Sequence, residues 1–390
     1  MKINYWLIIL LVLLSPAQLG FHFWPAWSLV NGIKVDYLSP TIYLTDLIFI
    51  GVLIISFIKF RQALFPKILI TIFLGLSLFS GKGNIPSVYW SLRYLQIPAL
   101  AWIIYINGRN FGIIRGIKKC LFFPLIFSLI LEVVQFSIKK STGWWWIFGE
   151  RTFSLATPNI ATIDLFGQRF LRPYATFSHP NALAGWLLLA AFILWKNKPQ
   201  RLMAIGGILL TFSRNALLAI FIGSMSYFVL ANKPYIQSII SFSESGSSGR
   251  VILNRVALKV FSDFPIFGIG PGKLLTELPN YFPPGFWSIQ PPHNVFLLIL
   301  AETGIFGFAI LLIGLLKIYP VLKRTPTLLP GLITVFSTSL LDHYWVTSQQ
   351  NRIILGIYLG FVLIGGFRSD NQSSISALAF GIRRNIGAGR

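Results

Sequence analysis

Three short blocks of this chain place arginine or histidine beside glycine, proline or asparagine. The block Arg172-Pro-Tyr-Ala-Thr-Phe-Ser-His179-Pro-Asn181 lies between a long polar loop and a long apolar run, and Gly249-Arg250 and His293-Asn294 occupy comparable places. Each block sets a positive charge or an imidazole where the chain passes between polar and apolar segments. Three such blocks on one face of a membrane protein predict a pocket for an anionic, lipid-linked substrate.

The residue types in these blocks suit the transfer of a phosphorylated group. Arginine is always charged, and its planar fork of donors matches phosphate oxygens, so two arginines can hold a diphosphate and stabilise it as it leaves. Histidine, with an ordinary pKa of about 6.5, can take the proton of an attacking hydroxyl. We therefore predict Arg172, Arg250 and His293 as catalytic residues for the displacement of a diphosphate by a sugar hydroxyl.

Four further polar residues near the blocks are predicted to bind substrate: Asn181, Arg214, Asn294 and Glu302. Each of these residues also has a structural explanation. Arginines near helix ends often extend to lipid headgroups, and His293 could cap the helix that follows it. For the ionisable residues Asp46, Arg93 and Glu132, a structural ion pair is as good an explanation as chemistry.

The sequence predicts no cofactor and no metal. The four histidines are scattered along the chain without paired acidic residues, and no metal-ligand spacing appears. The glycines of Gly268-Ile-Gly270-Pro-Gly272 do not form a nucleotide-binding motif, because no strand precedes them and a proline occupies the turn. Without a phosphate-binding loop, ATP-driven transport and nicotinamide chemistry are excluded.

The composition predicts an all-α, polytopic helical membrane protein with about 10–12 transmembrane helices. Mean hydropathy is +0.70, 55% of residues are hydrophobic and 11% are charged. The single cysteine, Cys120, excludes a disulfide framework. Apolar runs predict spans over 5–22, 39–58, 66–80, 86–106, 119–138, 180–195, 201–231, 293–316, 328–346 and 353–367.

The net charge of +22 lies in short patches between these spans, which indicates the orienting bias of cytoplasmic loops rather than nucleic-acid binding. With 201–231 as one broken passage, every short basic connection is cytoplasmic, as are both chain ends. The long connections 139–179 and 232–292 then lie outside, and Arg214 lies at membrane depth. Two crossings within 201–231 would invert everything downstream.

We expect one membrane domain over residues 1–367 and a basic, disordered cytoplasmic tail over 368–390. The first apolar segment is expected to be a retained helix rather than a cleaved signal peptide. In the second external loop, Arg250–Phe261 predicts an amphipathic helix, followed by a glycine-rich turn. In the first, the run Trp144-Trp145-Trp146 is typical of a membrane interface, with stacking on a sugar ring as the alternative.

Four ordered blocks resemble those of the O-antigen ligase and O-antigen polymerase superfamily. They are Arg172-x4-Phe-Ser-His179-Pro-Asn181; Leu-Thr211-Phe-Ser213-Arg214-Asn215; Gly249-Arg250 leading to Phe264-Pro-Ile-Phe-Gly-Ile-Gly270; and His293-Asn294-x7-Ala-Glu302-x-Gly304-x2-Gly307. The resemblance covers residues 165–315, with a large loop between the third and fourth blocks.

The resemblance implies an integral glycosyltransferase of the bacterial cytoplasmic (inner) membrane, with its active site facing the periplasm or cell exterior. The donor would be a glycan on undecaprenyl diphosphate, and neither nucleotide sugar nor metal would be required. Arg172 and Arg250 would contact the diphosphate, His293 would act at the reacting centre, and Glu302 would tune the site from deeper in the membrane lipid.

The resemblance leaves the acceptor open. A ligase would pass the glycan to a lipid-A core sugar or another surface acceptor, whereas a polymerase would pass it to a second carrier-linked glycan. We favour a ligase. A permease or flippase for a lipid-linked or anionic solute is the remaining alternative, with Asp46, Arg93, Glu132 and Arg214 along a translocation path; the absence of paired repeats in the sequence argues against it.

Overall fold

Helices account for 68% of the residues that the structure describes, which confirms the predicted helical class. The structure, a computed structural model, describes residues 2–60, 63–108, 111–231, 248–283, 286–324 and 328–365. The predicted tail at 368–390 and the polar segment that opens the second long loop, at 241–247, lie outside this described part.

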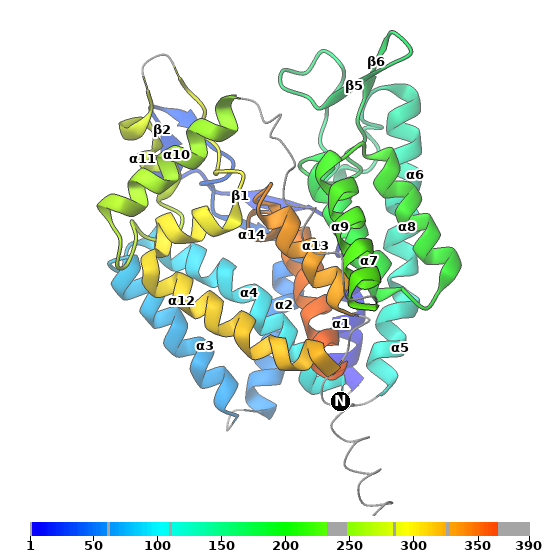
Figure 1. The fold of residues 1–390 in the computed structure, drawn as a ribbon, viewed down its shortest axis with the longest axis horizontal. Helices are drawn as coiled ribbons and strands as arrows, with labels where there is room; N and C mark the ends of the chain where they lie inside the picture. Colours follow the sequence, from blue (N-terminus) through cyan, green and yellow to red (C-terminus); the bar gives the residue numbers. More distant parts are fainter. Residues whose placement is uncertain are drawn as a thin grey trace, which may run out of the picture.

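The helices run between two ends of the molecule, with the N-terminus at the lower end in Figure 1. In the first half of the chain they are α1 (Lys2–Leu13), α2 (Leu44–Lys59), α3 (Leu64–Leu74) with the π-helical turn η2 (Gly75–Ser80), α4 (Ile85–Gly108), α5 (Phe111–Cys120) and α6 (Phe122–Ile138). In the second half they are α7 (Pro180–Ile193), α8 (Lys198–Leu210), α9 (Arg214–Ala231), α12 (Val295–Arg324), α13 (Leu329–Ser339) and a last helix over 349–365.

The upper end, here called the loop end, carries the short elements. They are β1 (Gly20–His22), η1 (Ala26–Ser28), β2 (Leu29–Val30), β3 (Ile33–Lys34), β4 (Thr41–Tyr43), η3 (Trp146–Phe148), β5 (Thr162–Leu165), β6 (Gln168–Leu171), α10 (Ser248–Asp263), α11 (Leu274–Glu277), η4 (Leu278–Tyr281) and α14 (Tyr344–Thr347). The strands form three two-stranded antiparallel sheets, β1–β4, β2–β3 and β5–β6.

The opposite end, here called the basic end, gathers cations from connections far apart in the sequence. Lys118 of α5 and Lys196 and Lys198 of the α7–α8 turn line one cavity there. The start of α1 reaches the same end, because Asn4 Nδ2 donates to Asn107 Oδ1 near the end of α4, at 3.2 Å. Two of the short basic connections predicted to share one side of a membrane, at Arg115–Lys119 and at Lys196–Lys198, thus lie at one end of the fold.

Two described helical stretches are long and apolar enough to cross a membrane, Gly112–Ile138 and Val295–Val321. Shorter apolar helices cover Ile3–Leu13, Leu64–Ser80, Pro180–Ile193 and Leu329–Ser339. The helices in two predicted spans, 5–22 and 39–58, are shorter than expected, because residues 20–22 and 41–43 pair as β1 and β4. These features are consistent with a helical membrane protein.

The prediction of a single broken passage over 201–231 is wrong, because the chain reverses direction at 211–213. Thr211, at the end of α8, lies at the start of α7, where its carbonyl accepts from Arg172 Nε at 2.8 Å. From there α9 runs antiparallel to α13, with Asn215 beside Leu341 and Ala219 beside Thr334. Two helices therefore pass where the sequence predicted one.

Polar side chains make this reversal possible. Phe212 adopts a φ of 49°, and the flanking hydroxyls satisfy the backbone groups that the turn exposes. Thr211 Oγ1 accepts from Ser213 N at 3.3 Å, and Ser213 Oγ accepts from Ala216 N at 3.4 Å, in the manner of a helix N-cap. Arg214 consequently lies at the beginning of α9 and is exposed, rather than in the middle of one broken passage.

The reversal also changes how the second long loop connects. From the loop end α9 runs toward the basic end, whereas α10 lies at the loop end (Figure 1). The residues that join α9 to α10, 232–247, lie outside the described part. The predicted amphipathic helix after them is confirmed, since α10 buries Leu253, Val256 and Val260.

A helix break fixes the glycine-rich turn at 264–272 against α12. Gly304 has a φ of 62° and a ψ of −163°, a conformation open essentially to glycine alone. The turn pairs with the freed backbone, as Gly270 N donates to Glu302 O at 2.8 Å. A Cβ added to Gly304 would lie 2.4 Å from Ile266 O, so this close approach also requires glycine.

Candidate functional site

Arg172 lies directly after β6, and its guanidinium turns inward. Besides the Nε bond to Thr211, its Nη2 donates to Asn181 Oδ1 at 2.9 Å. Burial lowers the pKa of Arg172, and the positive charges of Arg214 and Arg250 act in the same direction. The three arginines are therefore close enough to repel one another, which favours an anion between them.

Asn181 forms hydrogen bonds with three polar side chains at the loop end of the fold. His179 caps α7, Pro180 occupies its first position and Asn181 follows, nearly buried. The Asn181 side chain accepts from Arg172 and from Ser213 Oγ at 3.0 Å, and its Nδ2 donates to Asp342 Oδ2 at 2.9 Å. One amide thus joins the arginine to a carboxylate from the far end of the sequence.

Asp342 lies at the centre of the site, between α13 and α14. Its Oδ1 accepts from His343 N at 2.8 Å and lies 3.8 Å from His293 Nδ1. Burial alone would raise the pKa of Asp342, but the neighbouring imidazoles and His293 above all hold that pKa well below its usual range. The carboxylate is therefore charged under ordinary conditions and can orient an imidazole.

The three histidines near Asp342 differ in environment. His343 is buried, burial lowers its pKa to about 4, and its Nδ1 contacts Thr347 Oγ1 at 2.9 Å. His179 is exposed, and its Nδ1 accepts from Asn181 N at 3.1 Å, which leaves its ring proton on Nε2 when neutral. The His293 side chain is 17% exposed, and its ring centroid is 5.2 Å from that of His343.

His293 differs from the other two in its bonding. Its Nδ1 is buried and has no hydrogen-bond partner among the described residues, and the 3.8 Å separation from Asp342 is longer than a hydrogen bond. A shift of less than 1 Å would close that bond. Catalytic hydrogen bonds are often long before substrate binds and shorten in the complex, so the geometry suits a histidine that becomes aligned when it acts.

Arg250 and Arg214 supply positive charge at the edge of the cluster. Arg250 is half-buried in the first turn of α10, and its charge acts on Arg172 and on His343. Among the described residues, neither Arg250 nor Arg214 forms a hydrogen bond or an ion pair. Their donors remain available for phosphate oxygens.

Glu302 lies next to the cluster rather than within it. Its carboxylate accepts a hydrogen bond from Tyr94 O–H, and both residues line a cavity of about 20 Å³, room for about one water molecule. Tyr37 and Thr347 line the same cavity, and both contact His343. The structure therefore connects Glu302 to the histidines through one shell of side chains.

Asn294 has a structural task in addition to the predicted one. Its Oδ1 accepts from Phe296 N at 2.9 Å and from Leu297 N at 3.1 Å. Asn294, not His293, therefore caps α12, which leaves the His293 ring free for the site.

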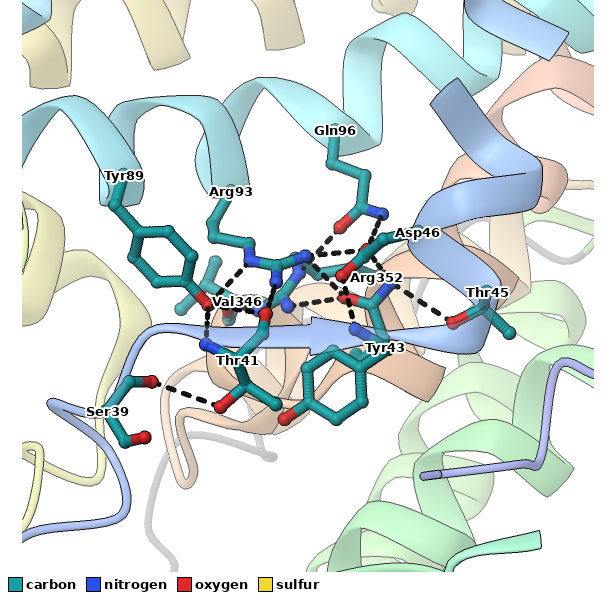
Figure 2. A network of polar contacts seen from close by, with 11 residues as sticks. Ser39, Thr41, Tyr43, Thr45, Asp46, Tyr89, Arg93, Gln96, Val346 and Arg352 are labelled. Atoms are coloured by element: carbon teal, nitrogen blue, oxygen red, sulfur yellow. Dashed lines mark hydrogen bonds and ion pairs between the residues drawn. The ribbon is translucent and has the colours of Figure 1, made fainter. Parts of the chain in front are cut away.

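The ionisable residues proposed for a translocation path do not come together. Asp46 and Arg93 form a buried ion pair at 2.6 Å inside a network with Gln96, Gln349 and Arg352 (Figure 2). Glu132, by contrast, is buried on α6 beside Gly207 of α8, and Arg214 lies at the start of α9. The Asp46–Arg93 pair is the structural ion pair that the sequence allowed.

One cluster in the described residues has the composition of a metal site. Ligand atoms of His293, Asp342 and His343 lie within 4.8 Å of one another. Most of these atoms already have partners: each Asp342 oxygen accepts a hydrogen bond, and His343 Nδ1 contacts Thr347. The geometry fits a hydrogen-bonded catalytic cluster better than an ion, and metal independence stays a prediction.

Residues 174–312 match the family model described as O-antigen ligase. No curated protein matches the chain. The match covers only part of the chain, and it supports the predicted resemblance to the O-antigen ligase and polymerase superfamily. It supports a ligase- or polymerase-like glycosyltransferase activity in general, and proteins of this family are membrane proteins.

Sequence reasoning missed Asp342 and His343, which lie beyond the matched region. The histidines are scattered along the sequence without paired acidic residues, but the fold brings His179, His293 and His343 around the single carboxylate of Asp342; His22 instead contacts Thr41 and Ser39. The sequence does contain a pattern that points to these two residues: Asp342-His343 follows an apolar run, and the other site blocks also lie next to apolar runs.

Proposed function

We propose that this protein transfers a glycan from a polyprenyl-diphosphate carrier, undecaprenyl diphosphate, to a hydroxyl of a surface acceptor such as a lipid-A core sugar. The observation that carries the proposal is the convergence of Arg172, Arg214 and Arg250 beside His293 and Asp342. A diphosphate placed among the arginines would bring its sugar next to an imidazole backed by a charged carboxylate.

In the proposed reaction, the acceptor hydroxyl oxygen attacks the anomeric carbon while the bond from that carbon to the diphosphate oxygen breaks. The electron pair leaves with the diphosphate, whose growing negative charge Arg172 and Arg250 stabilise. His293 takes the hydroxyl proton, and Asp342 stabilises the resulting imidazolium. Attack opposite the leaving group would invert the anomeric configuration.

The substrate-binding roles follow the same geometry. Arg214 would add a third positive charge for the carrier diphosphate, and Asn181 would hold Arg172 in position. Asn294 would orient His293 through the cap of α12. Glu302 would act from the neighbouring cavity, where its carboxylate would set the polarity of the surroundings of His343.

For localisation, we propose that the protein spans the bacterial inner membrane with about 10–12 helices and that the loop end faces the periplasm or cell exterior. The gathering of short basic connections at the opposite end supports this orientation. The donor and the acceptor would then meet at the outer leaflet, and the chemistry needs no nucleotide sugar.

A polymerase, which passes the glycan to a second carrier-linked glycan, is the alternative within the same site. It would use the same donor contacts and differ only in the acceptor. A permease has less support, because the buried Asp46–Arg93 pair is enclosed in its own network.

The test compares carrier-linked and surface-attached glycan in cells that produce wild type, Arg250→Ala or His293→Ala at matched abundance. The proposal expects carrier-linked glycan to accumulate at the expense of surface glycan in both variants. Long accumulated chains would indicate a ligase, and single repeats a polymerase. Unchanged pools in both variants would contradict the assigned site.

A further inference from the structure

A second candidate site lies at the basic end, opposite the histidine cluster. A cavity of about 580 Å³ opens there between α5 and the α7–α8 turn. Its lining includes five cationic residues: Arg115, Lys118, Lys119, Lys196 and Lys198. None of the lining residues that the structure describes is acidic. So many positive charges around one cavity, without a carboxylate in its wall, favour an anionic occupant.

The remaining wall of the cavity suits a molecule that is only partly charged. Ile114, Ile193 and Leu194 line it alongside the cations. At its rim α8 begins, where Asn197 Oδ1 accepts from Gln200 N at 3.4 Å, so the positive end of a 13-residue helix adds to the field. The exposed cations match the phosphate headgroup of a lipid, and the apolar side chains match the glycerol and acyl chains attached to that headgroup.

Aromatic residues place the cavity at the depth of a membrane interface. Trp195 is 42% exposed and stacks on Phe192 with ring centroids 5.8 Å apart. The Arg201 guanidinium lies over the Trp195 ring, 4.4 Å from its centroid. Tryptophan beside arginine is typical of the boundary between acyl chains and water, where lipid headgroups lie.

We propose that this cavity binds the headgroup of an anionic phospholipid of the membrane leaflet at the basic end. A headgroup with two phosphates, as in diphosphatidylglycerol, can pair with cations from both α5 and the α7–α8 turn. The orientation of the helices in a membrane requires positive charge in the connections. It does not require that charges from two connections line the same cavity. Basic pockets between helices on the cytoplasmic side are suited to such lipids. The inference does not depend on the reaction proposed for the loop end.

The test uses the full-length protein in bilayer discs of neutral phosphatidylcholine with increasing diphosphatidylglycerol, and native mass spectrometry of the lipid that stays bound. We expect saturable retention of diphosphatidylglycerol by the wild type. The double variant Lys196→Gln/Lys198→Gln should weaken this retention about 30-fold, at about fivefold for each charge removed. The control Lys140→Gln/Arg169→Gln removes two exposed charges at the loop end and should retain lipid like the wild type.

Each of the other outcomes overturns the inference. Equal retention by both double variants would mean that lipid binds elsewhere or without specificity. Millimolar inorganic diphosphate is added to the lipid-bound wild type and to Lys196→Gln/Lys198→Gln. Displacement of the lipid from the wild type but not from the variant would identify a site for a soluble anion instead. Thermal unfolding in neutral lipid checks that both double variants fold. If Lys196→Gln/Lys198→Gln does not fold, Lys119→Gln, which removes one exposed charge of the same cavity, replaces it. Unchanged retention by Lys119→Gln would also contradict the inference.

Discussion

Asn181 Nδ2 donates to Asp342 Oδ2 at 2.9 Å, and this bond joins the first site block to a carboxylate near the end of the membrane domain. Because Asn181 Oδ1 also accepts from Arg172, the amide separates a half-buried positive group from a buried negative one. A direct ion pair would neutralise both residues. The intervening amide leaves Arg172 able to bind an anion and Asp342 able to act on His293.

Asp342→Asn is expected to reduce glycan transfer strongly while preserving the fold. The variant keeps the shape of the side chain, but it removes the charge that orients and stabilises the His293 imidazolium. We expect a loss of about 10²–10⁴-fold in rate, measured at matched protein abundance. The control Asp164→Asn, on exposed β5, should transfer at the wild-type rate. Near-normal transfer by Asp342→Asn would exclude a role for the carboxylate in the chemistry.

His343 should make the protein less stable in mild acid. Burial lowers the pKa of His343 to about 4, whereas an unfolded histidine titrates at about 6.5. Between these values the unfolded chain binds a proton that the folded protein does not, so the free energy of unfolding falls as pH drops from about 6.5 toward 4. His343→Gln should flatten this dependence in unfolding measurements from pH 7.5 to 5. Parallel pH curves for variant and wild type would show that His343 is not buried as a neutral ring.

Gly304→Ala should destabilise the junction between α12 and the turn at 264–272. An alanine at a φ of 62° is strained by about 1–3 kcal/mol, and its Cβ would also collide with Ile266 O. Gly314→Ala is the matched control in the same helix, since a Cβ there meets no atom within 4 Å. That control should leave the unfolding midpoint unchanged or raise it slightly. Equal midpoints for the two variants would contradict the helix break.

Arg93→Met should lower stability without lowering the activity of the molecules that fold. It leaves the Asp46 carboxylate buried without its partner, at a cost of about 3–5 kcal/mol. The double variant Arg93→Met/Asp46→Leu should recover much of this loss, because it removes both charges. Transfer per folded molecule should match wild type in the double variant. Loss of function in a fully folded double variant would favour a translocation path through this pair.

The sequence predicted the helical class and the local elements well. Apolar runs located α4, α6 and α7 within a few residues, and α10 has the amphipathic pattern that burial of one face requires. These features depend on neighbouring residues, so they can be read from short windows. The reversal at 211–213 could not, because two short hydroxyl residues end one helix and begin the next without a break in hydrophobicity.

Some residues of the candidate site could be predicted because they, too, are recognisable from their neighbours in the sequence. Arg172, Asn181 and His293 stand out because each is polar beside an apolar run. Asp342 does too, but its importance depends on contacts with residues more than a hundred positions away, such as Asn181. The positions of Arg214 and Glu302 likewise depend on a helix reversal and a helix break, which only the packed structure reveals.

The most direct test of the proposed reaction follows the donor itself. Purified protein would be mixed with carrier-linked glycan and acceptor, both extracted from producing cells that lack the protein, and free polyprenyl diphosphate would be measured over time. We predict release by the wild type and a loss of at least about 10²-fold in His293→Ala, with the exposed-site control Asp164→Asn unaffected. Absence of release by the folded wild type, or equal release by His293→Ala, would contradict the reaction proposed for this site.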